Sequence, residues 1–365
     1  MLKYILVLFL FIFTLPVNAA KVKVVTKISP PNADMSGIAV SKDNRIFIGF
    51  PRHADNHDMP SLAEYKNGKL IPYPNEKMTM KGGNPYETLI SPHGMTMDAK
   101  DRLWIVDDGK LAGIQKIENG AAKVVCFDLT TNKVVYSIPI LPPVLQQDAH
   151  LNDLRVDLNH GKEGMVYITN SSFGETPSLV VVDIASGKSR EILKNHISTR
   201  AQAGFYTYLE QKPHTFDYDN LTFPAGGADG IALVAKENKL YWTSITGRGL
   251  YSISTDIISD FTKTEKEIEN AVKYEGDRPP CDGLAEDEDG NIYFGDFEQL
   301  AIIKRSPDGK YDLIAKDKNF IWPDGLAYSN GYVYVTLGQW NRLPGFNNGK
   351  DLRQPPYLVV KIRAK

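Results

Sequence analysis

The chain has 365 residues, is 42% hydrophobic and carries a formal net charge of -2. That length and apolar content are enough for a large folded core. A charge so close to zero argues against nucleic acid or an anionic membrane as a partner. Two cysteines, Cys126 and Cys281, exclude a disulfide-dense scaffold. They belong to different repeats, and whether they pair is left open.

The N-terminus is typical of a signal peptide. A short basic start, residues 1–4, precedes an apolar run over residues 5–17, and Val17 and Ala19 suit cleavage after Ala19. We therefore expect a signal peptide over residues 1–19, one domain over residues 20–365, and a secreted or periplasmic protein without stable membrane association after cleavage. An uncleaved anchor is the alternative, although the run is short for a bilayer span.

One phrase recurs six times: a small or polar residue, Gly, apolar, small, apolar, a turn, and then a β-branched and aromatic run. One copy is degenerate because Asp153 replaces the Gly. Each copy predicts a β-hairpin, and a second hairpin follows in most copies, as at residues 124–138, 179–193 and 301–314. Four strands repeated six times predict an all-β, six-bladed β-propeller. The copies span residues 36–48, 93–106, 152–168, 229–243, 282–294 and 324–335.

Closure of the ring supports the propeller. The last copy supplies only three strands, ending at residues 357–362, and residues 22–26 offer the missing outer strand. A ring closed by both ends of the chain leaves no free sheet edge, so we expect a monomer. Two unrelated β-sandwiches are the alternative, but sandwich strands do not repeat such a phrase.

Strand alternation predicts two different faces. We expect short connections of Asp, Asn, Gly and Lys on one face, and long loops on the other at residues 51–60, 73–92, 196–228 and 338–356. Long loops on a rigid scaffold are where binding sites are usually built. Aromatic residues in these loops either contact a ligand or pack the loops together. They include Phe205, Tyr206, Tyr208, Phe216, Tyr218, Trp340 and Phe346.

The residue at the start of each inner strand should lie at the mouth of the central channel. Five of the six are followed by Gly, which lets backbones approach closely around the axis. Three carboxylates in this ring would repel one another, so a cation, a raised pKa or a cationic ligand is expected. The alternative is that each Asp bonds to nearby backbone. The six candidate ligand-binding residues are Ser36, His93, Asn152, Asp229, Asp282 and Asp324.

A calcium ion, or another divalent cation, would suit oxygen ligands from Asn152, Asp229 and Asp282. The segment Asp107–Gly109 ends a neighbouring strand and is either a supporting shell or a turn. His93 is the single histidine at a ring position and is either catalytic or a hydrogen-bonded structural residue. No Gly-rich phosphate loop, metalloprotease helix, paired-cysteine zinc motif or nucleophile elbow is present.

Residues 93–98 with 103–107, 227–233 and 240–243 carry a family resemblance. The chain resembles the Yellow and major royal jelly protein family, in a bacterial-type version. The resemblance covers nearly all of the mature chain and implies a secreted six-bladed propeller. Some members of that family bind biogenic amines at the channel mouth, and some insect members convert dopachrome.

A more distant likeness, at residues 282–291, is to the senescence-marker and gluconolactonase propellers. Those enzymes hold a divalent metal through Glu, Asn and Asp, and here Asn152 and Asp282 match the Asn and Asp. Ser36 stands where the Glu would be needed. That departure weakens the case for both the metal and lactone hydrolysis.

The predicted ring and loops are consistent with three alternative functions. The first is binding of a cationic or polyhydroxylated small molecule by the acidic ring and the loop aromatics. The second is an enzyme: a lactonase in which Asp229 or Asp282 positions water beside a cation, or a tautomerase in which His93 and an Asp move a proton. The third is a protein-interaction platform.

Overall fold

The structure is a computed structural model that describes residues 22–29, 34–114, 116–216 and 223–364. The expected signal peptide, residues 1–19, lies outside the described residues. Within the described residues, no helix has the length and apolar character needed to cross a membrane. Cys126 and Cys281 are both buried and unpaired.

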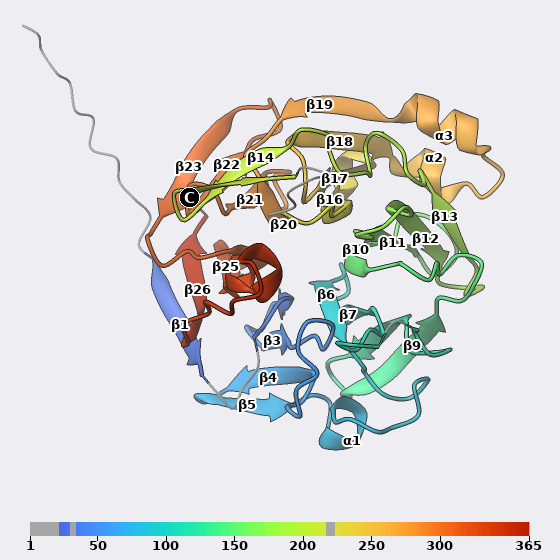
Figure 1. The fold of residues 1–365 in the computed structure, drawn as a ribbon. Helices are drawn as coiled ribbons and strands as arrows, with labels where there is room; N and C mark the ends of the chain where they lie inside the picture. The colour runs from blue at the N-terminus through green and yellow to red at the C-terminus, as the bar shows by residue number, and fades with distance from the viewer. Residues whose placement is uncertain (1–21, 30–33, 115, 217–222, 365) are drawn as a thin grey trace, which may run out of the picture.

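Six four-stranded antiparallel sheets surround a central axis, which confirms the six-bladed propeller (Figure 1). In each blade the first strand is innermost. The first three blades comprise β2 (Ile38–Val40), β3 (Ile46–Gly49), β4 (Leu62–Lys66) and β5 (Lys69–Pro72); β6 (Pro92–Met97), β7 (Leu103–Asp107), β8 (Lys123–Asp128) and β9 (Lys133–Pro139); and β10 (Leu151–Asp157), β11 (Met165–Asn170), β12 (Ser178–Asp183) and β13 (Ser189–Ile192).

The fourth and fifth blades follow the same order, and the sixth takes its outer strand from the N-terminal end. These blades comprise β16 (Ala228–Val234), β17 (Lys239–Ser244), β18 (Gly249–Ser254) and β19 (Lys273–Asp277); β20 (Cys281–Glu286), β21 (Ile292–Asp296), β22 (Ala301–Arg305) and β23 (Tyr311–Lys316); and β24 (Pro323–Ser329), β25 (Tyr332–Leu337), β26 (Tyr357–Arg363) and β1 (Lys23–Ile28).

The sixth blade closes as predicted. β1 pairs antiparallel with β26, from Lys23 opposite Lys361 to Ile28 opposite Tyr357. Ile28 is 2% exposed and packs in the same apolar cluster as Tyr357 and Val359. Because the outer edge of β26 is covered by β1, its backbone groups are paired within the blade.

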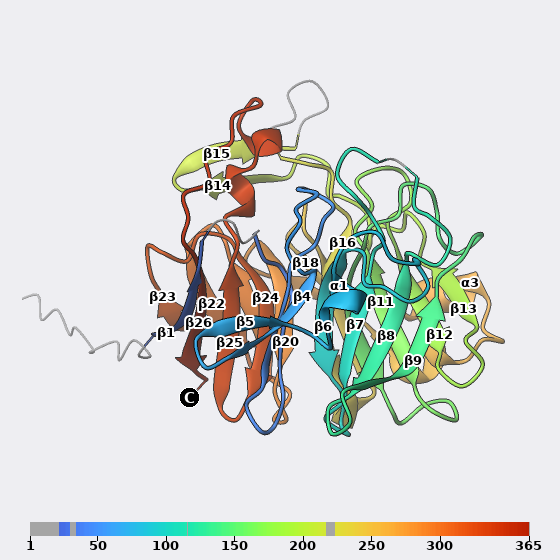
Figure 2. The same cartoon turned by 90° about the horizontal axis from the view of Figure 1, so that it is seen from below.

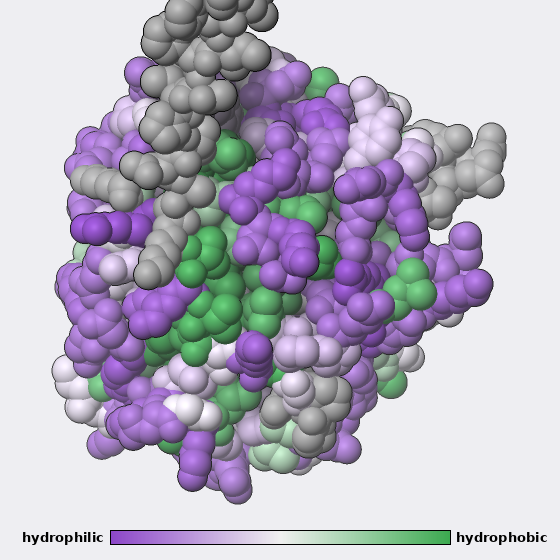
Figure 3. Space-filling model, turned by 90° about the vertical axis from the view of Figure 1, so that its left-hand side faces the viewer, coloured by the Kyte–Doolittle hydropathy of each residue, from purple (hydrophilic) through white to green (hydrophobic). Residues whose placement is uncertain are grey.

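The hydrophobic core lies between neighbouring blades. Trp104 on β7 and Val166 on β11, for example, belong to one buried cluster that joins the second and third blades. On the side of the molecule where β1 and β23 lie, apolar residues reach the surface among hydrophilic ones (Figure 3). Val24 of β1 and Leu313 of β23 are exposed apolar side chains of these strands.

The long loops gather at one end of the propeller, as predicted (Figure 2). They contain elements of their own that the repeat did not predict: α1 (Glu76–Thr79), the hairpin β14 (Tyr206–Leu209) with β15 (Lys212–Thr215), and the 3-10 turns η2 (Trp340–Arg342) and η3 (Pro344–Phe346). The hairpin lies at this end beside the axis, above the fifth and sixth blades (Figure 2).

The expectation of short connections on the opposite face was wrong for the fourth blade. There β18 and β19 are joined through α2 (Thr255–Ser259) and α3 (Glu265–Ala271), which pack at the outer rim. Ile258 and Ile268 bury their side chains in the core cluster of that blade. A short 3-10 turn, η1 (Ala235–Glu237), also joins β16 to β17.

Candidate functional site

The six predicted ring residues lie around the axis at the loop end of the inner strands. Their exposure ranges from 2% for Ser36 and Asp229 to 7% for Asn152 and Asp282. The pairing of five inner strands is irregular at this point, as between Pro92 and Met95 of β6. A local bulge of this kind redirects side chains out of the regular alternation.

The glycines that follow the ring residues allow the close approach that the sequence predicted. A Cβ atom on Gly283 would overlap the carbonyl oxygen of Asp324 in the next blade, and one on Gly325 would overlap that of Ser36. In the third blade Asp153 replaces the glycine, and its carboxylate lies 3.2 Å from Arg155 Nη1. The ring is therefore held together by backbone contact between adjacent blades.

The acidic members of the ring contact one another. Asn152 Nδ2 donates to Asp229 Oδ2 at 2.7 Å, and Asp282 is the neighbouring charge that acts most strongly on Asp229. Trp322 Nε1 donates to Asp282 Oδ2 at 2.5 Å. Asp229 Oδ1 is buried and has no hydrogen-bond partner among the described residues.

The pKa values of all three carboxyls are raised. Burial, followed by the charge of Asp282, raises the pKa of Asp229 well above the usual carboxyl value. Burial and then Asp282 likewise raise the pKa of Asp324. For Asp282, burial raises the pKa although the hydrogen bond from Trp322 opposes it. We assign a retained proton to Asp229, because burial and the charge of Asp282 both favour its protonated form.

Aromatic residues of the loops cover this acidic group. Phe297 and Trp322 stack at 4.6 Å between ring centroids, with 4° between their planes. Trp340 lies beside Asp324. These side chains belong to one apolar cluster, which we call the aromatic cap; its buried members are Phe205, Leu209, Phe216, Phe223, Ile245, Phe297, Trp322 and Trp340.

Some of the predicted loop aromatics are buried and others are exposed. Phe205, Phe216 and Trp340 are buried in the aromatic cap, and Phe346 packs against it. Tyr206 and Tyr208 are instead more than two-fifths exposed on the hairpin. Tyr218 lies outside the described residues.

Three histidines lie next to the ring, where the sequence had singled out only His93. One ring nitrogen each from His53, His93 and His150 lies within 4.8 Å of the others. His53 comes from the loop after β3, and His150 directly precedes β10. His150 could have been suspected, because it enters an inner strand two residues before Asn152. His53 carries no such signal.

The imidazoles of this group are held neutral. Burial, followed by the neighbouring His150, lowers the pKa of His93 to about 3. Burial and then Lys110 lower the pKa of His150 to about 3, and the pKa of His53 is lowered in the same way by burial and the other two imidazoles. Each therefore keeps one ring nitrogen free to accept.

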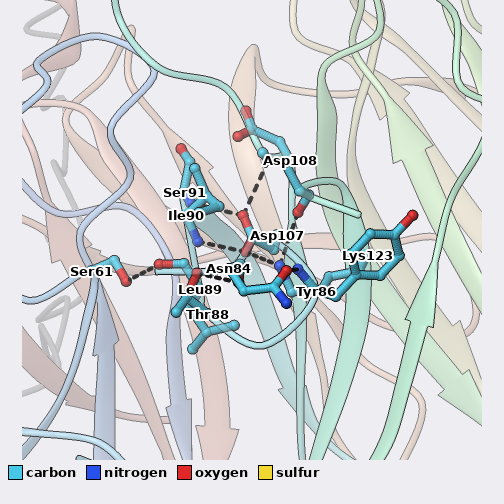
Figure 4. A network of polar contacts seen from close by, with 12 residues as sticks. Ser61, Asn84, Tyr86, Thr88, Leu89, Ile90, Ser91, Asp107, Asp108 and Lys123 are labelled. Carbon is cyan, nitrogen blue, oxygen red and sulfur yellow. Dashed lines mark hydrogen bonds and ion pairs between the residues drawn. The ribbon is translucent and has the colours of Figure 1, made fainter. Parts of the chain in front are cut away.

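In the segment Asp107–Gly109, the two aspartates make different contacts. Asp107 is structural: its carboxylate accepts from the backbone N–H of Ile90 and Ser91 and binds Lys123 Nζ at 2.9 Å (Figure 4). Asp108 faces the histidines instead, with Oδ2 at 2.9 Å from His150 Nδ1. The sequence left both roles open, and the structure assigns one to each residue.

The central channel is narrow below the ring. A cavity of about 20 Å³, roughly the space of one water molecule, touches Ser36, His93, Asn152 and Asp324. A larger cavity of about 100 Å³ lies further along the inner strands and is lined by Arg155 and other residues. Arg155 Nε there donates to both carboxylate oxygens of Glu286, at 3.0 and 2.9 Å.

The predicted calcium ligands are brought together, and their donor chemistry fits a cation. Asp229 and Asp282 supply carboxylate oxygens, and the orphaned Oδ1 of Asp229 is available to a ligand. Two features limit the fit: Trp322 occupies one oxygen of Asp282, and Asn152 turns its amide nitrogen toward Asp229. Calcium binds six to eight oxygen ligands, so the side chains of Trp322 and Asn152 would both have to turn before an ion could bind.

Fold and site together define the protein class as a six-bladed β-propeller that buries carboxyl and imidazole groups at the loop end of its axis. The sequence model of the family described as "Major royal jelly protein" matches residues 90–350. The chain belongs to the major royal jelly protein family, which confirms the resemblance drawn from the sequence.

Two relatives show how far the sequences of this family diverge from this chain. Major royal jelly protein 3 of Apis mellifera is 27% identical over 241 residues, covering 60% of this chain and 39% of the relative. Protein yellow of Drosophila madeirensis is 21% identical over 277 residues, covering 71% and 46%. The chain thus matches less than half the length of these relatives.

Solved structures share the fold at low identity. A gluconolactonase of Xanthomonas campestris has a TM-score of 0.53 at 10% identity, covering 94% of this chain and 89% of its own. Regucalcin of Agrobacterium tumefaciens, described as a calcium-binding protein, has a TM-score of 0.53 at 10% identity, with 94% and 96% covered. At such identity the likeness extends to the fold alone.

Proposed function

We propose that this propeller is an exported protein that binds a small cationic molecule, an organic amine, at the acidic ring beneath the aromatic cap. The observation that carries the proposal is the burial of Asp229, Asp282 and Asp324 with no ion pair to any of them among the described residues. Buried like charges are costly unless a positive group joins them or protons are retained.

The surroundings suit an ammonium group better than a neutral one. Trp322 meets Asp282 through its N–H edge, and Trp340 lies beside Asp324. One face of each indole is stacked on Phe297 or His53, and the remaining faces would attract a cation. Because the ring residues are at most 7% exposed, a ligand larger than water must displace part of the aromatic cap. The loop over residues 338–356 and the β14–β15 hairpin carry the cap residues that would move.

The test compares a charged ligand with an uncharged analogue of the same shape. Tyramine and 4-propylphenol are titrated into the purified protein by calorimetry, with tryptophan fluorescence as a second readout. We expect tyramine alone to bind, and Asp282→Asn to weaken it at least about tenfold, equivalent to about 1.4 kcal/mol. The exposed turn variant Asp308→Asn is the matched control and should bind like the wild type. Equal binding of both compounds would contradict the proposal.

A metal-assisted lactonase is the second candidate, because the same three carboxylates offer oxygen ligands to a hard cation. In that case Asn152, Asp229 and Asp282 would hold a calcium ion that polarises the lactone carbonyl. Calcium titration followed by an assay of lactone hydrolysis distinguishes the two candidates. Turnover that requires calcium and is lost in Asp229→Asn would favour the lactonase over the amine-binding protein.

A further inference from the structure

The three histidines beside the ring form a compact group of their own. The ring centroids of His53, His93 and His150 are separated by 5.0, 4.8 and 5.0 Å. Each comes from a different part of the chain: the loop after β3, the start of β6 and the residue before β10. Such convergence from three segments is not a consequence of the repeat, since only His93 occupies a repeated position.

Hydrogen bonding among the described residues leaves two atoms of this group unaccounted for. The Nδ1 atoms of His53 and His93 are buried and have no hydrogen-bond partner in that part of the chain. Buried polar atoms are normally paired, and an unpaired one calls for an explanation such as an ion. Two unpaired imidazole nitrogens within one group of three histidines are a stronger indication of a ligand than either would be alone.

The environment of His150 is that of a metal-binding imidazole. Asp108 Oδ2 lies 2.9 Å from its Nδ1 and makes no hydrogen bond within the described residues, so the carboxylate is placed to turn onto Nδ1 and leave Nε2 for an ion. Metal-binding histidines commonly turn their second nitrogen toward a carboxylate, which orients the ring. Asp108 is fixed in turn, because its other oxygen accepts from the backbone N–H of Lys110 at 2.9 Å.

We propose that His53, His93 and His150 form a binding site for a late first-row divalent transition metal, with Zn²⁺ as the reference ion. Imidazole ligands suit zinc, copper, nickel and iron, whereas calcium and magnesium prefer oxygen. Zinc–nitrogen bonds of about 2.0–2.1 Å in a tetrahedron put ligand nitrogens about 3.3 Å apart. The observed nitrogens, all within 4.8 Å, need only small side-chain movements to reach that spacing.

Three protein ligands leave one coordination position open in a tetrahedral site. Trp340 stacks on His53 with 5.5 Å between centroids and 20° between planes, and it also lies beside Asp324. The metal site therefore adjoins the acidic ring through Trp340 and does not use its carboxylates. This inference goes beyond the proposed amine binding and does not depend on it.

The test measures metal binding directly, without any assay of activity. The full chain is stripped with EDTA and titrated with Zn²⁺ against a chromogenic chelator, and with Co²⁺ by visible absorption. We expect one ion per chain, with the absorption of nitrogen-ligated tetrahedral Co²⁺. His150→Gln and His93→Gln should each weaken Zn²⁺ binding at least about 100-fold, and Asp108→Asn about 10–100-fold. His196→Gln, which alters a histidine outside the group, should bind like the wild type.

Near-ultraviolet circular dichroism in EDTA shows whether each variant is folded. If a histidine variant does not fold, the Co²⁺ spectrum of the wild type and the affinity of Asp108→Asn decide the question. The proposal is wrong if the wild type binds no stoichiometric ion or gives a Co²⁺ spectrum without nitrogen ligation. It is equally wrong if Zn²⁺ binding survives the histidine substitutions unchanged.

Discussion

A proton retained by Asp229 is the central electrostatic feature of the ring. Burial and the charge of Asp282 both favour the neutral form of this carboxyl. The folded protein therefore retains a proton that the unfolded chain, with ordinary carboxyl pKa values, releases. This difference links stability to pH.

The linkage predicts that the unliganded protein loses stability as pH rises. Below the ordinary carboxyl pKa of 3.8 both the folded and the unfolded state are protonated, and above it only the folded state keeps the proton, so unfolding releases it. Each such proton lowers the free energy of unfolding by up to about 1.4 kcal/mol per pH unit until the folded pKa is reached. Asp229→Asn cannot titrate, so its stability should fall less steeply with pH. Urea unfolding in EDTA at several pH values measures both slopes.

Asp308→Asn serves as the control for that experiment, because Asp308 lies in an exposed turn. Its slope should match the wild type. If Asp229→Asn and the wild type had the same pH dependence, the retained proton would be assigned wrongly.

The ring residues could be predicted from the sequence and the histidine group could not. Asp229, Asp282 and Asp324 occupy one phase of a repeat, so the symmetry of the fold places them around one axis. His53 and His150 lie outside the repeated phrase, and only the paths of two loops bring them to His93. Loop paths depend on local packing, which a comparison of repeats does not contain.

At the scale of elements, the six inner strands were predictable because their sequence pattern recurs in every blade. The helices, the 3-10 turns and the β14–β15 hairpin were missed because their sequences do not recur. α3 nevertheless begins with a recognisable signal: Thr264 and Glu267 form a capping box. A search for helix starts inside the copies would have indicated that helix. The β14–β15 hairpin has no counterpart in another blade.

The close contact between adjacent inner strands predicts that a side chain added at this contact destabilises the protein. Gly283→Ala would place a Cβ against the carbonyl oxygen of Asp324, and the neighbour is backbone that cannot rotate away. Overpacking of this kind costs about 1–3 kcal/mol. We expect a lower midpoint in urea unfolding with an unchanged slope. Gly345→Ala, which meets open space, is the control, and equal stability of the two variants would contradict the close approach.

For the whole molecule, the seam between β1 and β26 decides whether the ring stays closed. Every other blade is formed by one continuous stretch of chain, whereas the sixth joins segments separated by more than 300 residues. Closing this seam buries Ile28 against Tyr357 and Val359. It also pairs the outer backbone edge of β26, which would otherwise be open to another chain.

Removing the N-terminal strand should therefore both destabilise the protein and make it associate. A chain starting at residue 29 loses the β1–β26 ladder and the burial of Ile28, whose side chain alone is worth about 2–5 kcal/mol by analogy with buried isoleucine truncations. The control is a chain starting at residue 22, which keeps β1 whole. We expect a lower thermal midpoint for the shorter chain, and concentration-dependent association in sedimentation velocity because the bared edge of β26 recruits a second strand. The prediction is wrong if the shorter chain stays monomeric and has the same thermal midpoint as the control. Five complete blades and the three strands β24–β26 would then keep the ring closed without the β1–β26 pairing, and β1 would not be needed for closure.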